Sequence, residues 1–309
     1  MALHSRDFED TRQHGAPDGD PGVRVRDDAG SVHDKAIGQI LAELRDLSPD
    51  QIQQVLNHQH QHGLRFGEAA VALRLVETDD VLVALSRQFH YPYAPKERRR
   101  DSPDLVSLNE PFSYRAETFR ALRSQLLQRL WDRPGPKRAL SVISSDIGDG
   151  KTYCACNLAV SMAQLGGHTL LVDADLRNPR VHSVFHVDNG RGLSGILSGR
   201  AETKVIQPVD GVEGLYVLPS GVAPPNPLEL LERPAFGLLL QELVGKFDHV
   251  LVDTPAAAHG ADAAVVAQRC QAALVVARRN ASRVGALQDL IGSLNDATVQ
   301  LAGVVVNEW

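Results

Sequence analysis

The sequence predicts an α/β protein with a doubly wound, mostly parallel sheet that carries a phosphate-binding loop, preceded by a small all-helical domain. From Arg138 onward, short runs rich in Val, Leu and Ile alternate with stretches of helical periodicity, a pattern typical of buried parallel strands joined by helices. The first of these runs leads into a glycine-rich segment ending in Gly-Lys-Thr, which joins a strand to a helix in phosphate-binding domains. A helical repeat in the first third of the chain predicts the second domain.

The composition is that of a soluble globular chain with more than one folding unit. Of its 309 residues, 43% are hydrophobic, 23% are charged and 5% are aromatic. This length exceeds the ~250–300 residues at which a single core usually stops growing. The formal net charge of −6 excludes a generally basic surface, so we expect no binding of nucleic acid.

Cysteine content and hydropathy predict a cytoplasmic chain. Cys154, Cys156 and Cys270 are too few for a disulfide framework or a four-ligand zinc site, which favours a reducing compartment. No run approaches the ~18–20 apolar residues that span a bilayer, and the first residues lack the apolar stretch of a signal peptide. Contact with the inner membrane is therefore expected only through a partner.

Composition divides the first part of the chain into three segments. Residues 1–33 are polar and rich in Asp, Gly and Arg, which predicts a disordered arm. Residues 34–93 hold two copies of one pattern, aligned so that Gly38 matches Gly67, and predict a helical module. Several prolines and the run KERRRD predict a linker over residues 94–110.

Each copy of the repeat predicts a short helix, a tight turn and a second helix. The second helices are expected to begin at caps, Ser48 in the first copy and Thr78 in the second, each followed by an acidic residue in the first turn. Two such hairpins make a small four-helix module.

Residues 111–309 predict the larger domain. A helix near its start is amphipathic, and its apolar side carries Phe119, Leu122, Leu126, Leu127 and Leu130. The expected strands are ALSVISS, HTLLVDAD, LYVLPSG, HVLVDTP, AALVVARR and LAGVVVN. The helices between them include YCACNLAVSMAQLG and PAFGLLLQELVGKF, which completes a doubly wound sheet with ligands at the carboxyl ends of its strands.

The segment SSDIGDGKT predicts a phosphate cradle at the start of a helix. Backbone N–H groups in such a loop point at the anion, the lysine reaches the β- and γ-phosphates, and the threonine hydroxyl binds Mg²⁺. ATP and Mg²⁺ are therefore the expected cofactors. Ser145 occupies the first position, where the motif has Gly, and Tyr153 is expected to pack near the nucleotide. The remaining residues of the expected cradle are Gly148, Asp149, Gly150, Lys151 and Thr152.

Three aspartates follow predicted strands at the same sheet edge. Asp173 and Asp175 end HTLLVDAD, and Asp253 ends HVLVD. Taken singly, each aspartate is typical of a helix cap or a turn. Because the carboxyl ends of parallel strands meet beside the loop, the three together favour carboxylates linked to Mg²⁺.

These motifs resemble those of the bacterial tyrosine kinase (BY-kinase) domain, a branch of the MinD/ParA-like P-loop ATPases. The resemblance lies in the GKT loop, LLVDADLRNPRVHSVF, GLSGILSGR, VLPSGVAPPNPLELLERPAF and HVLVDTPAAAHGADA, and it extends from about Pro111 to the end. In the family the first, second and last of these are the Walker A, Walker A′ and Walker B motifs. Ala256 departs from the family, which usually has a second Pro there.

The resemblance implies transfer of the ATP γ-phosphoryl group to a tyrosine hydroxyl. Lys151 would stabilise the transferring group, and Asp173 would accept the tyrosine proton. Asp175 and Asp253 would hold Mg²⁺, and Asn307 would contact adenine. Arg177 would reach a phosphate or an acidic side chain.

The resemblance also implies a homo-oligomer. Glu117, Arg120 and Arg123 match the E-x-x-R-x-x-R pattern through which BY-kinase subunits associate, and their spacing places them on one helical face. A ladder of ion pairs within the helix is the alternative interpretation.

The narrower resemblance is to EpsG-type proteins, which carry a helical domain in front and accompany a membrane chain-length determinant (polysaccharide co-polymerase) protein in exopolysaccharide synthesis. The family's C-terminal tyrosine cluster is absent, because no tyrosine follows Tyr216, so the acceptor stays open between another protein and tyrosines such as Tyr91 and Tyr93.

The alternative function is a MinD/ParA-like regulatory ATPase switch without kinase activity. Asp146 stands where those ATPases have a signature lysine.

The helical module resembles the N-terminal domain of type II secretion and MshE-type ATPases, some of which bind cyclic di-GMP. The second copy keeps Arg65 and Gly67 of the binding repeat, but the first has Ala36 in place of the arginine. Arg45 and Arg74 stand where the motif has Gly. Since close backbone approach needs glycine, we expect a protein-docking module rather than a cyclic di-GMP site.

Overall fold

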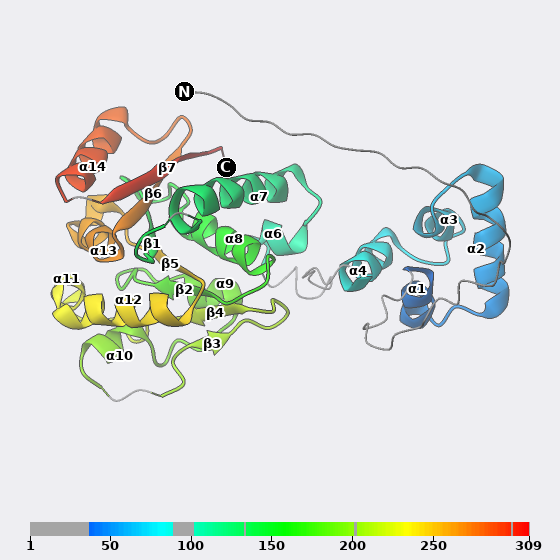
Figure 1. Cartoon of the computed structure of the whole chain (residues 1–309), viewed down its shortest axis with the longest axis horizontal. Helices are drawn as coiled ribbons and strands as arrows, with labels where there is room; N and C mark the ends of the chain where they lie inside the picture. The colour runs from blue at the N-terminus through cyan, green and yellow to red at the C-terminus, as the bar shows by residue number, and fades with distance from the viewer. Residues whose placement is uncertain (1–36, 89–101, 133, 201–202, 298, 309) are drawn as a thin grey trace, which may run out of the picture. The chain divides into compact units, whose positions relative to one another are not determined.

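The computed structural model describes residues 37–88, 102–132, 134–200, 203–297 and 299–308, and its elements are labelled in Figure 1. The expected arm over residues 1–33 lies outside these ranges, as do residues 94–101 of the expected linker. Residues 34–36 and 89–93 of the expected helical module, which include Tyr91 and Tyr93, also lie outside them. The helical module (residues 37–88) and the P-loop domain (residues 102–308) are taken in turn. Within the described residues, no helix is long and apolar enough to cross a membrane.

The helical module contains the two expected hairpins. Its helices are α1 (Ile37–Arg45), α2 (Pro49–His62), α3 (Phe66–Ala72) and α4 (Thr78–Gln88). Ser48 caps α2 as expected, because its side chain accepts from the Gln51 N–H while the Gln51 side chain accepts from the Ser48 N–H. The expectation for Thr78 is wrong. Thr78 is already helical, and the carboxylate of Asp80 accepts from the Glu77 N–H at 2.7 Å.

The matching glycines of the module face protein side chains. A Cβ added at Gly67 would lie 2.7 Å from a methyl group of Val81, and one at Gly38 would lie 3.4 Å from the Phe66 ring. Helix packing therefore fills the space that these glycines leave. The core around them consists of Ile40, Leu41, Val55, Ala69, Ala70, Val76 and Ala84.

A seven-stranded sheet of order β3-β4-β2-β5-β1-β6-β7 forms the centre of the P-loop domain. The six expected strands are confirmed as β1 (Leu140–Ile143), β2 (Thr169–Asp173), β4 (Leu215–Leu218), β5 (His249–Asp253), β6 (Ala272–Arg278) and β7 (Gln300–Asn307). All pair in parallel, whereas β3 (Gln207–Pro208) is antiparallel to β4. Two residues carry no readable periodicity, so β3 was not expected.

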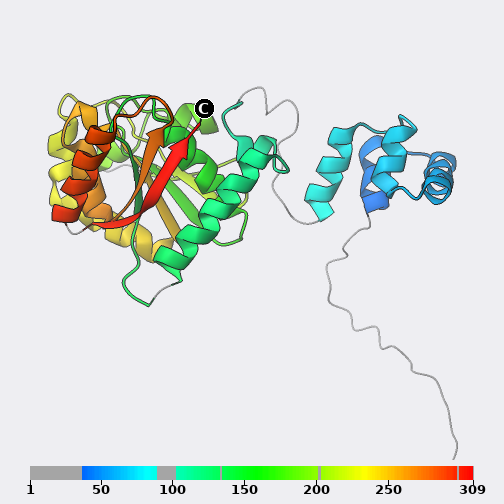
Figure 2. The ribbon, with the colours of Figure 1, turned by 90° about the horizontal axis from the view of Figure 1, so that it is seen from above.

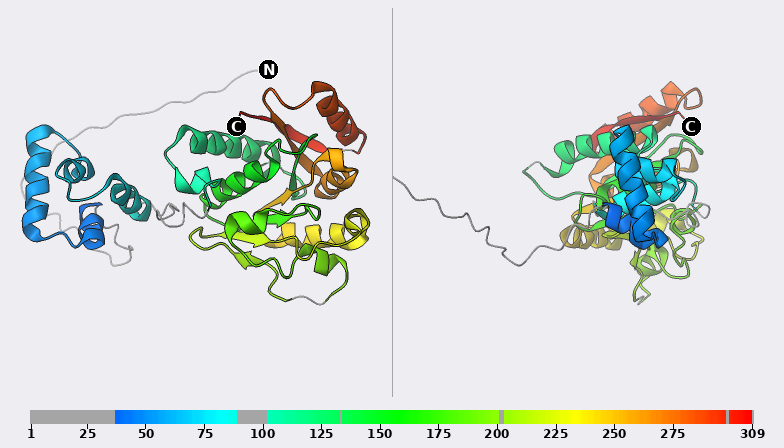
Figure 3. Two further views of the ribbon diagram at one scale, coloured as in Figure 1. Left: turned by 180° about the vertical axis from the view of Figure 1, so that it is seen from behind. Right: turned by 90° about the vertical axis from the view of Figure 1, so that its right-hand side faces the viewer.

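Helices cover both faces of the sheet, as Figures 2 and 3 show. One face carries α6 (Val106–Asn109), α7 (Tyr114–Leu126), its π-helical continuation η1 (Leu127–Trp131), α8 (Lys151–Ala163) and α9 (Val181–Phe185). The other carries α10 (Leu193–Leu197), α11 (Pro227–Glu232), α12 (Pro234–Lys246), α13 (Asp262–Cys270) and α14 (Val284–Asp296). The short 3-10 helix η2 (Ala257–His259) follows β5.

The packed P-loop domain begins before residue 111. Leu105, Val106 and Leu108 are buried in its core, and the Asn157 side chain on α8 accepts from the Ser107 N–H at 2.9 Å. The expected linker therefore extends too far, because LVSL is too short to show a helical period among prolines and charges.

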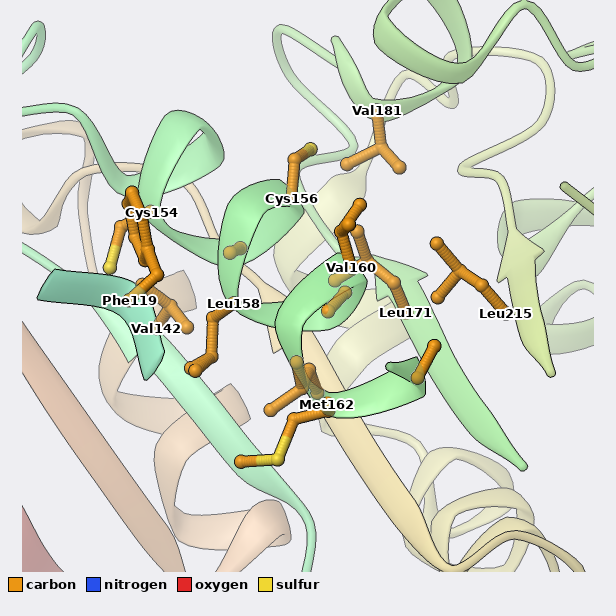
Figure 4. Close-up of a cluster of buried hydrophobic side chains, with 14 of the residues drawn as sticks. Phe119, Val142, Cys154, Cys156, Leu158, Val160, Met162, Leu171, Val181 and Leu215 are labelled. Atoms are coloured by element: carbon orange, nitrogen blue, oxygen red, sulfur yellow. The ribbon is translucent and has the colours of Figure 1, made fainter. Parts of the chain in front are cut away.

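Helix α8 is the centre of the larger core. Small side chains let it lie close to the sheet, and Cys154, Cys156 and Met162 are buried among the residues drawn in Figure 4. All three cysteines are buried and free, and burial raises the pKa of the Cys154 thiol to about 12. Cys154 and Cys156 pack in the core between α8 and the sheet, whereas Cys270 packs on the other face at the end of α13.

Candidate active site

The glycine-rich loop lies between β1 and α8 and depends on glycine at two positions. Gly148 has φ of 84° and Gly150 has φ of 96°, values that side chains rarely allow. A Cβ at Gly150 would also overlap the side-chain amide of Asn307. The loop thus brings its backbone to the start of α8, where the helix N–H groups attract anions.

Residues distant in sequence hold the loop in this shape. Asp149 is 2% exposed and accepts from the Asp146 N–H at 2.9 Å and from the Ser282 hydroxyl at 2.7 Å. Asn307 donates from Nδ2 to the Asp149 carbonyl at 3.0 Å. Asn307, expected beside adenine, therefore contacts the loop itself. No pattern around Ser282 indicated its contact.

Lys151 lies against the same loop. Its side chain is buried and Nζ donates to the Ser144 hydroxyl at 3.0 Å. Burial lowers the pKa of Lys151, and the charges of Asp253 and Asp175 oppose that shift. Ser145 is also buried, and its hydroxyl donates to Asp146 at 3.2 Å, so serine is accommodated at the first position of the motif.

Thr152 and Asp253 meet at the start of α8. The Thr152 hydroxyl donates to Asp253 Oδ2 at 2.7 Å. Asp253 Oδ1 is buried and has no hydrogen-bond partner among the described residues. Burial raises the pKa of Asp253 to about 7, against the opposing effects of the Thr152 hydrogen bond and the Lys151 charge. The free oxygen fits a cation or one of its water ligands.

The two aspartates after β2 differ in exposure. Asp173 is fully buried, and its two oxygens accept from the N–H groups of Asp175 and Val181, both at 3.1 Å. Burial, followed by the charge of Asp253, raises the pKa of Asp173 well above its usual range. Asp175 is half-buried and accepts from the N–H groups of Arg177 and Asn178. Asp173 therefore shapes the segment that presents Asp175.

A cavity of about 520 Å³ lies over the loop. Its lining includes Lys151, Thr152, Tyr153 and Asp175 of the expected site, but not Asp173. Sequence reasoning missed Asn178, Arg180 and His259, for which the only signal was their place after the second and fourth expected strands. Within the described residues, no three His, Cys, Asp or Glu side chains form a metal-binding group. A cation here would need further oxygen ligands.

Tyr153 and Arg177 hold neighbouring elements together. The Tyr153 ring packs edge-on against Phe119 at 5.9 Å between centroids, and burial raises its pKa. Arg177 donates through two nitrogens to the two oxygens of Asp262, each at 3.1 Å, and Asp262 is fully buried. Arg177 was expected to reach either a phosphate or an acidic side chain, and its contact with Asp262 is of the second kind.

The E-x-x-R-x-x-R residues make contacts within the chain. Arg120 donates from Nε to Glu117 at 2.8 Å along α7, and Arg123 donates to the Ser161 carbonyl on α8 at 2.6 Å. The Glu117 side chain is 64% exposed. The ion pair expected under the alternative interpretation is present, and the subunit interface stays a prediction.

The fold and the loop define a nucleotide-binding domain: residues 140–309 match the family described as CobQ/CobB/MinD/ParA nucleotide binding domain. The chain is 30% identical over 210 residues to tyrosine-protein kinase wzc of Salmonella typhi, covering 68% of this chain and 29% of that protein. It is 34% identical over 173 residues to tyrosine-protein kinase YwqD of Bacillus subtilis (strain 168), covering 56% and 72%. The kinase domain of the Escherichia coli tyrosine kinase ETK has a TM-score of 0.62 and 34% identity, covering 66% and 79%.

The chain belongs to the bacterial tyrosine-protein kinase branch of this nucleotide-binding family. It spans less than a third of the length of the Salmonella relatives. The BY-kinase resemblance and the MinD/ParA-like fold predicted from the motifs are confirmed. The narrower resemblance to EpsG-type proteins, and that of the helical module to secretion ATPases, stay predictions.

Proposed function

We propose that the protein is an ATP- and Mg²⁺-dependent protein-tyrosine kinase. The observation that carries this proposal is the arrangement of the buried Lys151 and the Thr152–Asp253 pair beneath the 520 Å³ cavity. Membership of the bacterial tyrosine kinase family supports the choice of tyrosine as the acceptor.

The residues present fit Mg²⁺. Thr152 offers a hydroxyl, and Asp253 offers the buried Oδ1 that lacks a partner among the described residues. Asp175, which borders the cavity, would complete the protein ligands directly or through water. When bound, Mg²⁺ neutralises phosphate charge during the transfer.

The loop would bind the triphosphate through backbone N–H groups. These belong to Gly148, Asp149, Gly150, Lys151 and Thr152. The Lys151 ammonium would leave Ser144 for the β- and γ-oxygens, where its charge stabilises the transferring group. Tyr153 would line the phosphate side, and Asn307 would lie beside the base while its amide holds the loop.

In the proposed reaction the tyrosine oxygen attacks the γ-phosphorus, the bond to the β,γ-bridging oxygen breaks, and ADP leaves. Asp173 is the proposed acceptor of the phenol proton. Because its oxygens are occupied by the Asp175 and Val181 N–H groups, this role requires the segment before α9 to move. Asp175 already borders the cavity, so comparison of Asp173→Asn and Asp175→Asn separates proton acceptance from metal binding.

The proposed setting follows from the EpsG-type resemblance. We propose a homo-oligomer in which α7 contributes Glu117, Arg120 and Arg123 to the interface, and a membrane chain-length determinant as the partner in exopolysaccharide synthesis. For the helical module we propose docking of a protein. The packing of Phe66 and Val81 against Gly38 and Gly67 supports this over cyclic di-GMP.

The test is phosphotyrosine formation by the purified full chain with Mg·ATP, alone and with a Glu-Tyr copolymer as acceptor. Lys151→Ala should lower the rate by ~10²–10³-fold, because it removes the cation that stabilises the transferring group. Lys246→Ala, which alters an exposed lysine paired with Glu242 on α12, is the matched control. ATP hydrolysis without phosphotyrosine on either acceptor would contradict the kinase and favour the MinD/ParA-like switch.

A further inference from the structure

We propose that Tyr114, the first residue of α7, is a tyrosine that one copy of the chain presents to the active site of another copy. The inference rests on the proposed kinase activity and names an acceptor for it. In the transfer, the Tyr114 oxygen would bond to the γ-phosphorus of ATP, ADP would leave, and the phenol proton would pass to a carboxylate of the receiving site.

Exposure distinguishes Tyr114 from the other tyrosines in the described ranges. Tyr114 is 83% exposed. Tyr153 packs on Phe119, and Tyr216 lies between the rings of His168 and Phe247, with 5.6 Å between centroids on each side. A phosphoacceptor ring has to leave its own surface and enter another cavity. Tyr114 is the described tyrosine that would do so without breaking ring contacts.

The structure disfavours transfer to Tyr114 within one chain. Tyr114 borders a second cavity of about 320 Å³, which includes Phe119, Asn307 and Glu308, and it does not line the cavity over Lys151 and Asp175. Helix α7 is fixed to its own domain by the buried Phe119 and by the hydrogen bond from Arg123 to Ser161. The ring is therefore held away from its own γ-phosphate position, and a second copy has to supply the site.

The surroundings of Tyr114 complement the cavity over the glycine-rich loop. Phe112, two residues away, is 61% exposed, and Ile147 at the cavity is 69% exposed. These two apolar side chains would cover each other when Tyr114 enters. Glu110 is exposed on the same segment, and Arg180, whose side chain is 66% exposed, lines the cavity. Arg180 pairs with the exposed Asp104 of its own chain at 3.7 Å, so Glu110 of the entering copy would compete with Asp104 for this guanidinium, and the apolar pair is the main complement.

The position of Tyr114 at the start of α7 also suits the negatively charged phosphotyrosine that the transfer would form. Tyr114 is the first residue of a 13-residue helix, where backbone N–H groups and the helix dipole favour a negative charge. The acidic neighbour one turn along, Glu117, is already neutralised by Arg120 at 2.7 Å. A phosphate at Tyr114 would therefore not face an uncompensated carboxylate at that position.

The experiment mixes two variants of the full chain with Mg·ATP. Tyr114→Phe provides an active site without the acceptor, and Lys151→Ala provides the acceptor without an active site. We expect phosphate on Tyr114 of the Lys151→Ala chain, mapped by mass spectrometry, at a rate that rises with concentration. The control Tyr216→Phe, which keeps the ring between His168 and Phe247, should leave phosphorylation of Tyr114 unchanged.

A parallel reaction on a Glu-Tyr copolymer separates this inference from the proposed function. Phosphorylation of the copolymer, with Tyr114 unmodified or with phosphate confined to another tyrosine of the chain, overturns the assignment of Tyr114 and leaves the kinase standing. Absence of phosphotyrosine from both acceptors overturns both proposals. Complete loss of phosphate from the mixture when the acceptor chain also carries Tyr114→Phe supports the assignment.

Discussion

Glycines serve opposite purposes in the helical module and in the P-loop domain. Gly38 and Gly67 of the module lie in helices and make room for the side chains of Phe66 and Val81. Gly148 and Gly150 of the loop have positive φ, and Gly148 has open space where a side chain would be, apart from an Arg278 nitrogen at 4.0 Å. The first pair gives room for packing in ordinary helical backbone, whereas the second gives the loop a left-handed backbone, with the Asn307 side chain packed against Gly150.

Glycine in a repeat is therefore a weak sign of a nucleotide site. In both regions the same residue removes a Cβ, but only the loop combines this with left-handed backbone and a helix N-terminus. The following changes test whether the two regions are as independent as this contrast implies.

The largest effect is expected for Gly150→Ala. The new Cβ would overlap Asn307, at about 1–3 kcal/mol for overpacking, and would demand a positive φ, at about 1–2 kcal/mol, so the loop would lose its phosphate-binding shape. Titration calorimetry with Mg·ADP should show at least ~10²-fold weaker binding. Gly148→Ala, which meets the strained φ without the overlap, should lose less, ~10-fold for 1–2 kcal/mol of strain. Equal losses would contradict a specific contact between Asn307 and Gly150.

An intermediate effect is expected for Gly67→Ala in the module. Its Cβ would lie 2.7 Å from Val81, and overpacking of a buried site costs about 1–3 kcal/mol. Hydrogen exchange of the full chain should show faster exchange in α3 and α4, with Mg·ADP affinity unchanged. Gly38→Ala, whose Cβ would make ordinary contact with Phe66, should be neutral or stabilising because alanine favours a helix by up to ~1 kcal/mol. Weaker nucleotide binding in Gly67→Ala would show that the regions are coupled.

The smallest effect is expected on the stability of the P-loop domain when His249 is protonated at low pH. Burial lowers the pKa of His249, so the unfolded chain binds the proton more readily, and stability falls as the pH drops below 6.5. Trp131, edge-on to this ring at 5.2 Å, reports the urea transition in a Trp309→Phe background, which removes the second of the two tryptophans. His249→Gln should make the decline shallower. If stability depends on pH in the same way with and without His249→Gln, the decline does not come from His249.

Most of the sheet was predictable because its strands are buried on both faces and therefore appear as continuous apolar runs. The strands at Leu140, Thr169 and His249 were found in this way, with helices between them. The segment at Leu105 and the pair Gln207–Pro208 were not, because neither is long enough to show a period. Their structure is set by contacts with α8 and β4.

The site was predictable where its residues belong to recognisable motifs that meet at one edge of the sheet. Lys151, Thr152 and Asp253 lie together as expected, since a loop and the end of a nearby parallel strand share one edge. The contact between Ser282 and Asp149 was not predictable, because these residues are 133 positions apart in the sequence and no motif spacing marks them.

The sequence by itself determined the sheet, the glycine-rich loop and the type of ligand, because periodicity and glycine position are local properties of the chain. Only the tertiary structure decided which aspartate is covered and which borders the cavity, that Asn307 holds the loop, and which described tyrosine is exposed. These depend on how a side chain packs against residues far away in sequence. Burial, and with it pKa and accessibility, is a property of the folded environment and not of the residue alone.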